Sequence, residues 1–429
     1  MNRTATLVLF AALFSGGSIS QANTVGLYGP TTAKKAEAQF EKLNRDLHKA
    51  VRFESVDTVK RLIQEGADVN STIPGGLSAL TIAAGKNSSF EVVEALIAAG
   101  ADVNPELKDG ITPLITAMVN PNSDHSIVQV LIEAGANVNA RENKHGFSVL
   151  MIAAGSPSVS TEVVSLLIRA GVDVNARDSS GRTALRRAIE NNADFGHVVA
   201  KLLIDAGADI NDWADGSLSL LNYAVMEQKV QVVRMLIDAG VDVSARGPEF
   251  TALMRAAMHE DEFGILEMLI EAGADIESQK ENDGTTALMV AVIKQREHNV
   301  DTLLKAGANV NVCRSDDLRS AVHHAVRKDG QVAILEKLLD SGGCVNAADK
   351  SGMTPLILGS MRSVDSDIMR FLIGAGADVN AIQADGATAL MAAARDERGA
   401  ENLMILIDAG ADVNTQWSKG GTADLPPKT

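Results

Sequence analysis

The residues that could carry out chemistry in this chain are few, and their spacing does not fit a catalytic or metal site. His323 and His324 are adjacent, so on a helix they point about 100° apart and cannot share a metal ion as histidines four residues apart would. The His259-Glu260-Asp261 run could attract a cation but is more typical of a solvated loop. No Gly-x-Ser-x-Gly nucleophile motif occurs. We therefore expect no catalytic residues, no bound cofactor and no metal site.

Aspartate and asparagine recur in a regular pattern, as Gly-Ala-Asp-Val-Asn at residues 66–70 and its relatives. The copies lie 33 to 36 residues apart. They begin at Gly66, Gly100, Gly135, Gly171, Gly207, Gly240, Gly273, Gly307, Gly342, Gly376 and Gly410. A calcium array would need a run such as Asp-x-Asp-x-Asp-Gly, which is absent. We interpret the Asp and Asn as turn residues, because their short side chains satisfy backbone donors in turns.

A period of this length indicates one supersecondary unit per copy, since a single unit cannot bury its own apolar face and must stack on its neighbours. Aromatic residues make up only 3% of the chain, as expected for thin layers packed by small aliphatic side chains. The formal net charge of −16 and the lack of a basic stripe argue against a nucleic-acid partner.

Each period repeats the same local signals, as residues 178–211 illustrate. A turn at Gly181 precedes Thr183, which can cap a short helix, and a second helix is expected over His197–Ala206. Gly207 then ends that helix in the left-handed conformation that favours glycine.

The N-terminus is typical of an export signal. Arg3 is followed by the apolar stretch Ala5–Phe14, which is too short to span a bilayer, and by the small and polar residues Ser15–Ala22. An ordinary apolar helix is the alternative. No later stretch is long and apolar enough to cross a membrane. We predict a signal peptide at 1–22, a leader and capping helix at 23–42, the repeat domain at 43–414 and a disordered tail at 415–429.

Two cysteines, Cys313 and Cys344, fall at non-equivalent places in neighbouring repeats. Neighbouring layers are about 8–10 Å apart, whereas a disulfide needs Cα atoms within about 7 Å. We expect two free thiols, with a bridge as the alternative.

The helix starts Thr112-Pro113-Leu114 and Thr354-Pro355-Leu356, together with Gly-Ala-Asp-Val-Asn at this period, resemble the ankyrin repeat. The resemblance covers about residues 43–414. It implies an all-α ankyrin-repeat solenoid of about 11 helix-turn-helix units with projecting β-hairpin loops, and a groove lined by the loops and the first helices.

The same resemblance places a partner-binding surface on the groove side of the loops and at the ends of the first helices. Several residues there are large and apolar where a solvated stripe would be mostly polar, and packing against neighbouring loops is the alternative explanation. Two arginines and one tryptophan could add polar and aromatic anchors. The predicted contact residues are Phe147, Leu218, Met226, Phe250, Met258, Ile293, Arg182, Arg319 and Trp213.

These observations favour a non-catalytic, monomeric scaffold, exported to the periplasm of a Gram-negative bacterium, that binds a protein partner in its groove. No stable membrane insertion is expected. Two alternatives remain open at this point: an inhibitor or immunity protein that neutralises a toxic enzyme, and a secreted effector that binds a host protein.

Overall fold

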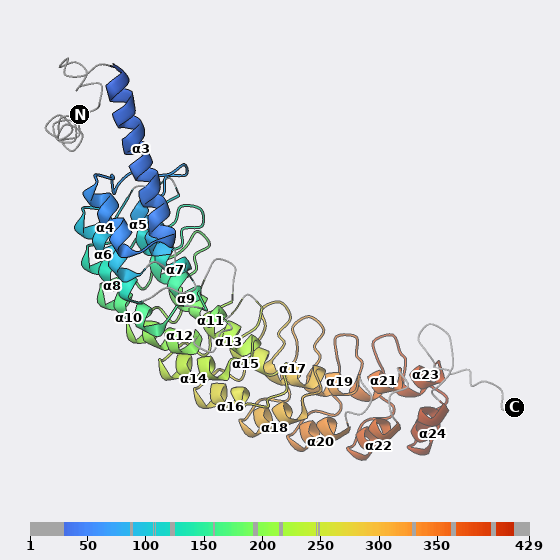
Figure 1. Ribbon diagram of the computed structural model, residues 1–429. Helices are drawn as coiled ribbons and strands as arrows, with labels where there is room; N and C mark the ends of the chain where they lie inside the picture. Colours follow the sequence, from blue (N-terminus) through green and yellow to red (C-terminus); the bar gives the residue numbers. More distant parts are fainter. Residues whose placement is uncertain are drawn as a thin grey trace. The chain divides into compact units, whose positions relative to one another are not determined.

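The computed structural model describes residues 30–85, 89–105, 107, 109–120, 125–157, 159–191, 196–213, 218–245, 247, 249–327, 332–361, 366–395 and 400–415. Over these residues the chain forms 22 helices and no strand, so the expected all-α repeat solenoid is confirmed (Figure 1). The predicted signal peptide and all of the predicted tail except Thr415 lie outside the described residues. The chain divides into two compact units, Met1–Asp215 and Gly216–Thr429.

The first unit begins with a long helix and continues with alternating first and second helices of successive repeats. Helix α3 packs against both α4 and α5, so the predicted capping helix and the first helix of the first repeat form one continuous element. The helices of this unit are α3 (Pro30–Phe53), α4 (Val56–Gln64), α5 (Ala79–Gly85), α6 (Phe90–Ala98), α7 (Pro113–Val119), α8 (His125–Glu133), α9 (Val149–Gly155), α10 (Thr161–Arg169), α11 (Ala184–Glu190) and α12 (Gly196–Asp205).

The second unit contains six more helix pairs, in which each odd-numbered helix is the first of its repeat. First helices pack against first helices of the adjacent repeats, and second helices pack against second helices. The helices are α13 (Leu220–Met226), α14 (Val230–Asp238), α15 (Ala252–Ala256), α16 (Ile265–Glu271), α17 (Ala287–Ile293), α18 (Glu297–Lys305), α19 (Ala321–Ala325), α20 (Val332–Asp340), α21 (Pro355–Ser360), α22 (Ser366–Gly374), α23 (Ala389–Ala394) and α24 (Ala400–Asp408).

The helix boundaries follow the signals seen in the sequence. The hydroxyl of Thr183 accepts a hydrogen bond from the Arg186 amide at the start of α11, as expected. Gly207 adopts φ +87° after α12, the left-handed geometry predicted for a helix stop. Eight other first helices carry the same hydroxyl cap, at Ser78, Thr112, Ser148, Ser219, Thr251, Thr286, Thr354 and Thr388.

The core of each unit includes a row of aliphatic side chains from the first helices, a leucine in each helix from α5 to α23 except α19, where Val322 takes its place. Burial of each such side chain stabilises the stack by about 1.5–3 kcal/mol. None of the following is more than 2% exposed: Leu80, Leu114, Leu150 and Leu185 in the first unit, and Leu221, Leu253, Leu288, Leu356 and Leu390 in the second. Some of the loops contain an isolated antiparallel β-bridge, for example between Thr72 and Ser78.

The Asp and Asn of the repeated signature have different roles. Asp102 closes its own turn, because its Oδ1 accepts from the Asn104 amide at 2.9 Å. Asn70 instead reaches the next repeat: its Oδ1 accepts from the Asp102 amide at 2.7 Å and its Nδ2 donates to the Gly100 carbonyl at 3.0 Å. The interpretation of this Asn as a turn residue was therefore incomplete, since it joins consecutive repeats.

The same pair of hydrogen bonds is made by Asn104, Asn175, Asn311, Asn346 and Asn380. The second unit contains two departures from it. Ser244 accepts from the Asp275 amide at 3.0 Å, and Glu277 accepts from the Asn309 amide at 2.7 Å. A carboxylate has no proton to donate, so Glu277 cannot supply the second bond. These two junctions are therefore joined less tightly.

We predict that Asn346→Ala destabilises the second unit by about 1–2 kcal/mol, because two bridging hydrogen bonds are lost. Ser244→Ala removes one acceptor and should cost about half as much. Urea unfolding of the full chain, with hydrogen-exchange protection of the flanking helices, measures both. An equal effect of the two substitutions would contradict the bridging role of the asparagine amide.

Candidate functional site

The adjacent histidines of α19 are buried and have a structural role. His323 is fully buried, and its Nδ1 accepts from the Ser320 amide at 3.2 Å, which caps the helix. Burial lowers the pKa of His323, and it lowers the pKa of His324 to about 3, so both rings are neutral at physiological pH. Among the residues that the structure describes, no group of three or more His, Cys, Asp or Glu side chains could hold a metal ion. Cys313 and Cys344 are free and exposed.

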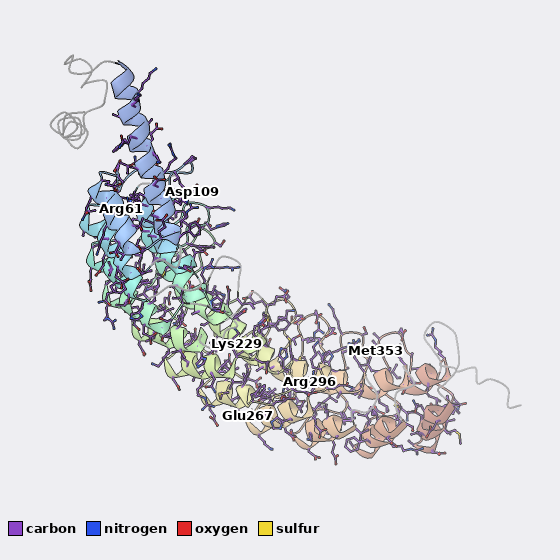
Figure 2. The ribbon with its side chains drawn as sticks, viewed as in Figure 1. Arg61, Asp109, Lys229, Glu267, Arg296 and Met353 are labelled. Carbon is purple, nitrogen blue, oxygen red and sulfur yellow. The ribbon has the colours of Figure 1, made fainter. Side chains whose placement is uncertain are left out.

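The loops between repeats project on the side of the first helices in each unit (Figure 1). We call this surface the loop face. Figure 2 shows Met353 among these loops and Glu267 on the opposite side, in the row of second helices. All nine predicted contact residues lie in described segments, three in the first unit and six in the second.

In the first unit, two of the predicted contact residues are engaged by other side chains of the chain. The Phe147 ring stacks on His145, with ring centres 5.1 Å apart, and the Arg187 guanidinium lies 3.7 Å above its centre. Arg182 is exposed and pairs with Glu190 at 3.4 Å. Phe147 is thus held between two side chains, whereas Arg182 remains accessible.

Trp213, the third of these residues, is 40% exposed and directly follows a buried charged group. The Asp212 carboxylate is fully buried; it accepts a hydrogen bond from the Thr183 hydroxyl at 3.0 Å and pairs with Arg177. Arg186 is also buried, with 2% exposure, and burial lowers its pKa while the charges of its acidic neighbours oppose that change. The sequence reasoning missed this buried polar network.

In the second unit, five predicted apolar residues form what we call the Phe250 patch. Its members are Leu218, Met226, Phe250, Met258 and Ile293, and each is half-buried. The patch spans three consecutive repeats, because α13 packs on α15 and α15 on α17. The structure thus places these residues in neighbouring repeats and leaves part of each one accessible.

The centre of the patch is the Phe250 ring. The Lys280 ammonium lies 4.6 Å from the ring centre and the Arg255 guanidinium lies 5.7 Å from it. A shallow, open cleft lies beside the ring. It is lined by Gly247, Glu249, Phe250, Thr251, Met254, Gln279, Lys280, Glu281 and Asn282.

The segment that carries Met258 is held in place by the next repeat. Arg296 donates through Nε to the Met258 carbonyl at 3.1 Å and pairs with Glu260 at 2.7 Å (Figure 2). The Asn299 amide donates to the His259 carbonyl at 2.8 Å. This segment is therefore positioned before any partner arrives, which reduces the entropy lost on binding.

Arg319 is engaged within the chain, although it was predicted as a partner contact. Its guanidinium lies 2.9 Å from the buried Asp349 carboxylate of the following repeat and 3.7 Å from Asp317. Its side chain is only 18% exposed. In the structure Arg319 joins two loops, and its contact with a partner stays a prediction.

A pair of carboxyl groups lies on the second-helix side of the same unit. Asp261 accepts from the Ile265 amide at 2.7 Å and the Leu266 amide at 3.0 Å, which caps α16. Burial, and then the neighbouring Glu267 carboxylate, raise the pKa of Asp261 to about 6. Glu267 also contacts His298 at 3.2 Å and Thr302 at 3.0 Å, and its own pKa is lowered, first by the hydrogen bond with Asp261.

This carboxyl pair makes the local stability depend on pH. The pKa of Asp261 is higher in the folded chain than its ordinary value of 3.8, so its contribution is greatest at low pH and is lost as pH rises through about 6. We expect Asp261→Asn to remove this dependence. The amide of the variant keeps one capping acceptor, and the stability that the variant loses does not change with pH. Between pH 5 and 7.5 the stability of the variant relative to the wild type should therefore rise by about 1 kcal/mol, after allowance for solvent screening.

Hydrogen exchange of residues 259–271, compared between variant and wild type at each pH, measures the effect. Asp238→Asn, at the exposed end of α14, is the matched control. A difference that stays constant from pH 5 to 7.5 would rule out the raised pKa of Asp261.

Within the described segments, no helix combines the length and the apolar character that crossing a membrane requires.

In comparison with known proteins, a family model described as "Ankyrin repeats (3 copies)" matches seven overlapping stretches. These are residues 47–142, 126–214, 150–247, 195–280, 221–314, 253–349 and 322–417.

Among curated proteins, the mouse protein "Ankyrin repeat and SOCS box protein 6" is 38% identical to this chain over 74 residues. The match spans 17% of this chain and 17% of that relative. The similarity therefore concerns the repeats and not the whole of either protein. Ankyrin repeats indicate a protein–protein interaction scaffold, and proteins built from them are generally non-catalytic. The family matches run from residue 47 to 417, and the helix pairs and Asn bridges of the described residues agree with them, so this chain belongs to the ankyrin-repeat family.

Proposed function

We propose that this protein is an exported, non-catalytic scaffold that binds a protein partner through the Phe250 patch on the loop face of its second unit. The observation that carries this proposal is the incomplete burial of all five patch residues. Core residues of the adjoining first helices are fully buried, for example Leu253 of α15 and Leu288 of α17, each at most 2% exposed. Packing within the stack therefore leaves these particular side chains with accessible apolar area.

The energetics are sufficient for a specific complex. Burial of one such side chain in an interface contributes about 1.5–3 kcal/mol, so three or four reach the roughly 8 kcal/mol of micromolar binding. The Phe250 ring beside its cleft, with two cations against it, provides an aromatic anchor of the kind that dominates interfaces. The pre-positioned segment at Met258 adds rigidity to the same surface.

The double variant Phe250→Asp, Met258→Asp is expected to bind its partner at least 100-fold more weakly, because two apolar anchors become charged groups that must be desolvated. Affinity capture from periplasm, followed by titration of the captured protein, measures the loss. Met404→Asp is the matched control, since Met404 is 64% exposed on α24, away from the patch. Equal binding by the folded double variant would eliminate the patch as the site. The identity of the captured protein separates a general scaffold from an inhibitor of a toxic enzyme.

Export to the periplasm through residues 1–22 is part of the proposal, and it is supported by the short apolar stretch after Arg3. Expressed in a Gram-negative host, the chain should appear in the periplasm with Asn23 as its first residue. Intact mass and N-terminal sequencing check this. Leu9→Arg, which interrupts the apolar stretch, should leave the precursor unprocessed in the cytoplasm. Recovery of the unprocessed wild-type chain from the cytoplasm alone would refute the export step.

A further inference from the structure

One loop of the second unit contains a strained residue that the fold does not require. The Leu318 loop, residues 314–319, has Leu318 at φ +60°, the left-handed region that disfavours residues with a side chain. The amide of Leu318 donates to the Arg314 carbonyl at 3.1 Å. In the preceding loop Gly284 makes the equivalent bond to the Lys280 carbonyl at 2.8 Å with φ +75°. The same backbone turn is thus built with glycine one repeat earlier.

Glycine also occupies the left-handed position of the following loop, where Gly352 has φ +76°. The other described non-glycine residues with positive φ are Gln228 and Gln295, which are polar. Leu318 alone among these combines the strained backbone with a bulky apolar side chain. Glycine there would remove the strain and keep the turn.

Burial does not offset this strain. The Leu318 side chain is 47% exposed, so it adds little to the core. Strained residues that persist without a local benefit are characteristic of ligand and partner contacts. The strained backbone at Leu318 is explained if another molecule buries its side chain.

The loop that presents Leu318 is rigid. The Arg314 guanidinium pairs with Asp283 of the preceding loop at 3.3 Å and with Asp316 at 2.7 Å. On the other side Arg319 pairs with Asp349 at 2.9 Å. Backbone hydrogen bonds reinforce both junctions: the Ser315 amide donates to Asp283 at 2.9 Å and the Lys350 amide donates to Asp317 at 2.8 Å. A side chain fixed in this way loses little entropy on binding.

The charge around Leu318 indicates the chemistry of the partner. The Arg314 and Arg319 side chains are each 18% exposed, whereas those of Asp316 and Asp317 are 46% and 30% exposed. The arginines thus lie below the surface and the carboxylates lie at it. An approaching molecule therefore meets an apolar tip within an acidic rim, which is complementary to a basic surface.

We propose that the Leu318 loop is a second contact surface, at which Leu318 enters an apolar pocket, rimmed by Lys and Arg side chains, on a protein partner. The acidic rim accelerates association and the Leu318 side chain supplies the affinity. This surface shares no residue with the Phe250 patch, so the two proposals are tested by different variants.

The test begins with a photo-reactive benzoylphenylalanine at position 318 of the full chain, and at position 250 in a parallel sample, irradiated in periplasmic extract. The protein cross-linked at position 318 is then purified without the cross-link and titrated against the variants below. Absence of a protein cross-linked at position 318 overturns the inference whatever position 250 captures. Capture at 318 alone counts against the Phe250 patch instead.

The decisive variant is Leu318→Gly. We expect its urea-unfolding midpoint to rise, because the strain is relieved, while affinity for the captured protein falls about 10- to 100-fold. Leu318→Met should keep most of the affinity. Asp316→Asn should weaken binding only a few-fold and reduce its dependence on salt. A Leu318→Gly variant that binds as tightly as the wild type would overturn the proposal. If the variant binds more weakly while its urea-unfolding midpoint is raised, misfolding is not the cause of the weaker binding.

Discussion

The structure depends on the contact between consecutive repeats, because no single pair of these short helices can bury its own leucine. Each leucine of the core lies between its own repeat and its neighbours, and the bridging asparagines add a polar connection at the turn. Stability is therefore the sum of local terms along the chain. Where Ser244 and Glu277 replace the asparagine, the junction keeps a single bridge and becomes the less tightly joined part of the second unit.

This local organisation leaves the loops free to differ from one another. The loops of the second unit use that freedom in two ways. Around Phe250 they expose apolar side chains, and the Lys280 ammonium lies over the Phe250 ring. Around Leu318 two arginines draw the carboxylates of three loops into one network and hold an apolar side chain at the tip. The helices hold the loops in position, and the loops present the side chains of both proposed contact surfaces.

The buried side chain of Arg186 shows how far the repeat can vary. Arg186 occupies the position in α11 that Met151 holds in α9 and Met254 holds in α15, yet it is just as inaccessible to solvent. Its charge is accommodated because Glu190 and the backbone of Asp212 lie close to it. A methionine can fill such a space by its flexibility alone, whereas an arginine there needs polar partners, here Glu190 on the same helix and the Asp212 carbonyl.

The sequence alone determined the fold of this protein. The repeat length, the Thr or Ser before each first helix and the Gly after each second helix are local signals, and each acts within a few residues. The tertiary structure decided which side chains are engaged within the chain and which stay accessible, because contacts with residues 30 or more positions away along the chain leave no local signal. Arg319 is engaged by Asp349, the Asn amides bridge to the next Gly, and Leu318 has a backbone angle that the sequence does not reveal. Short-range sequence patterns predict the fold, whereas the proposed contact surfaces depend on contacts between repeats.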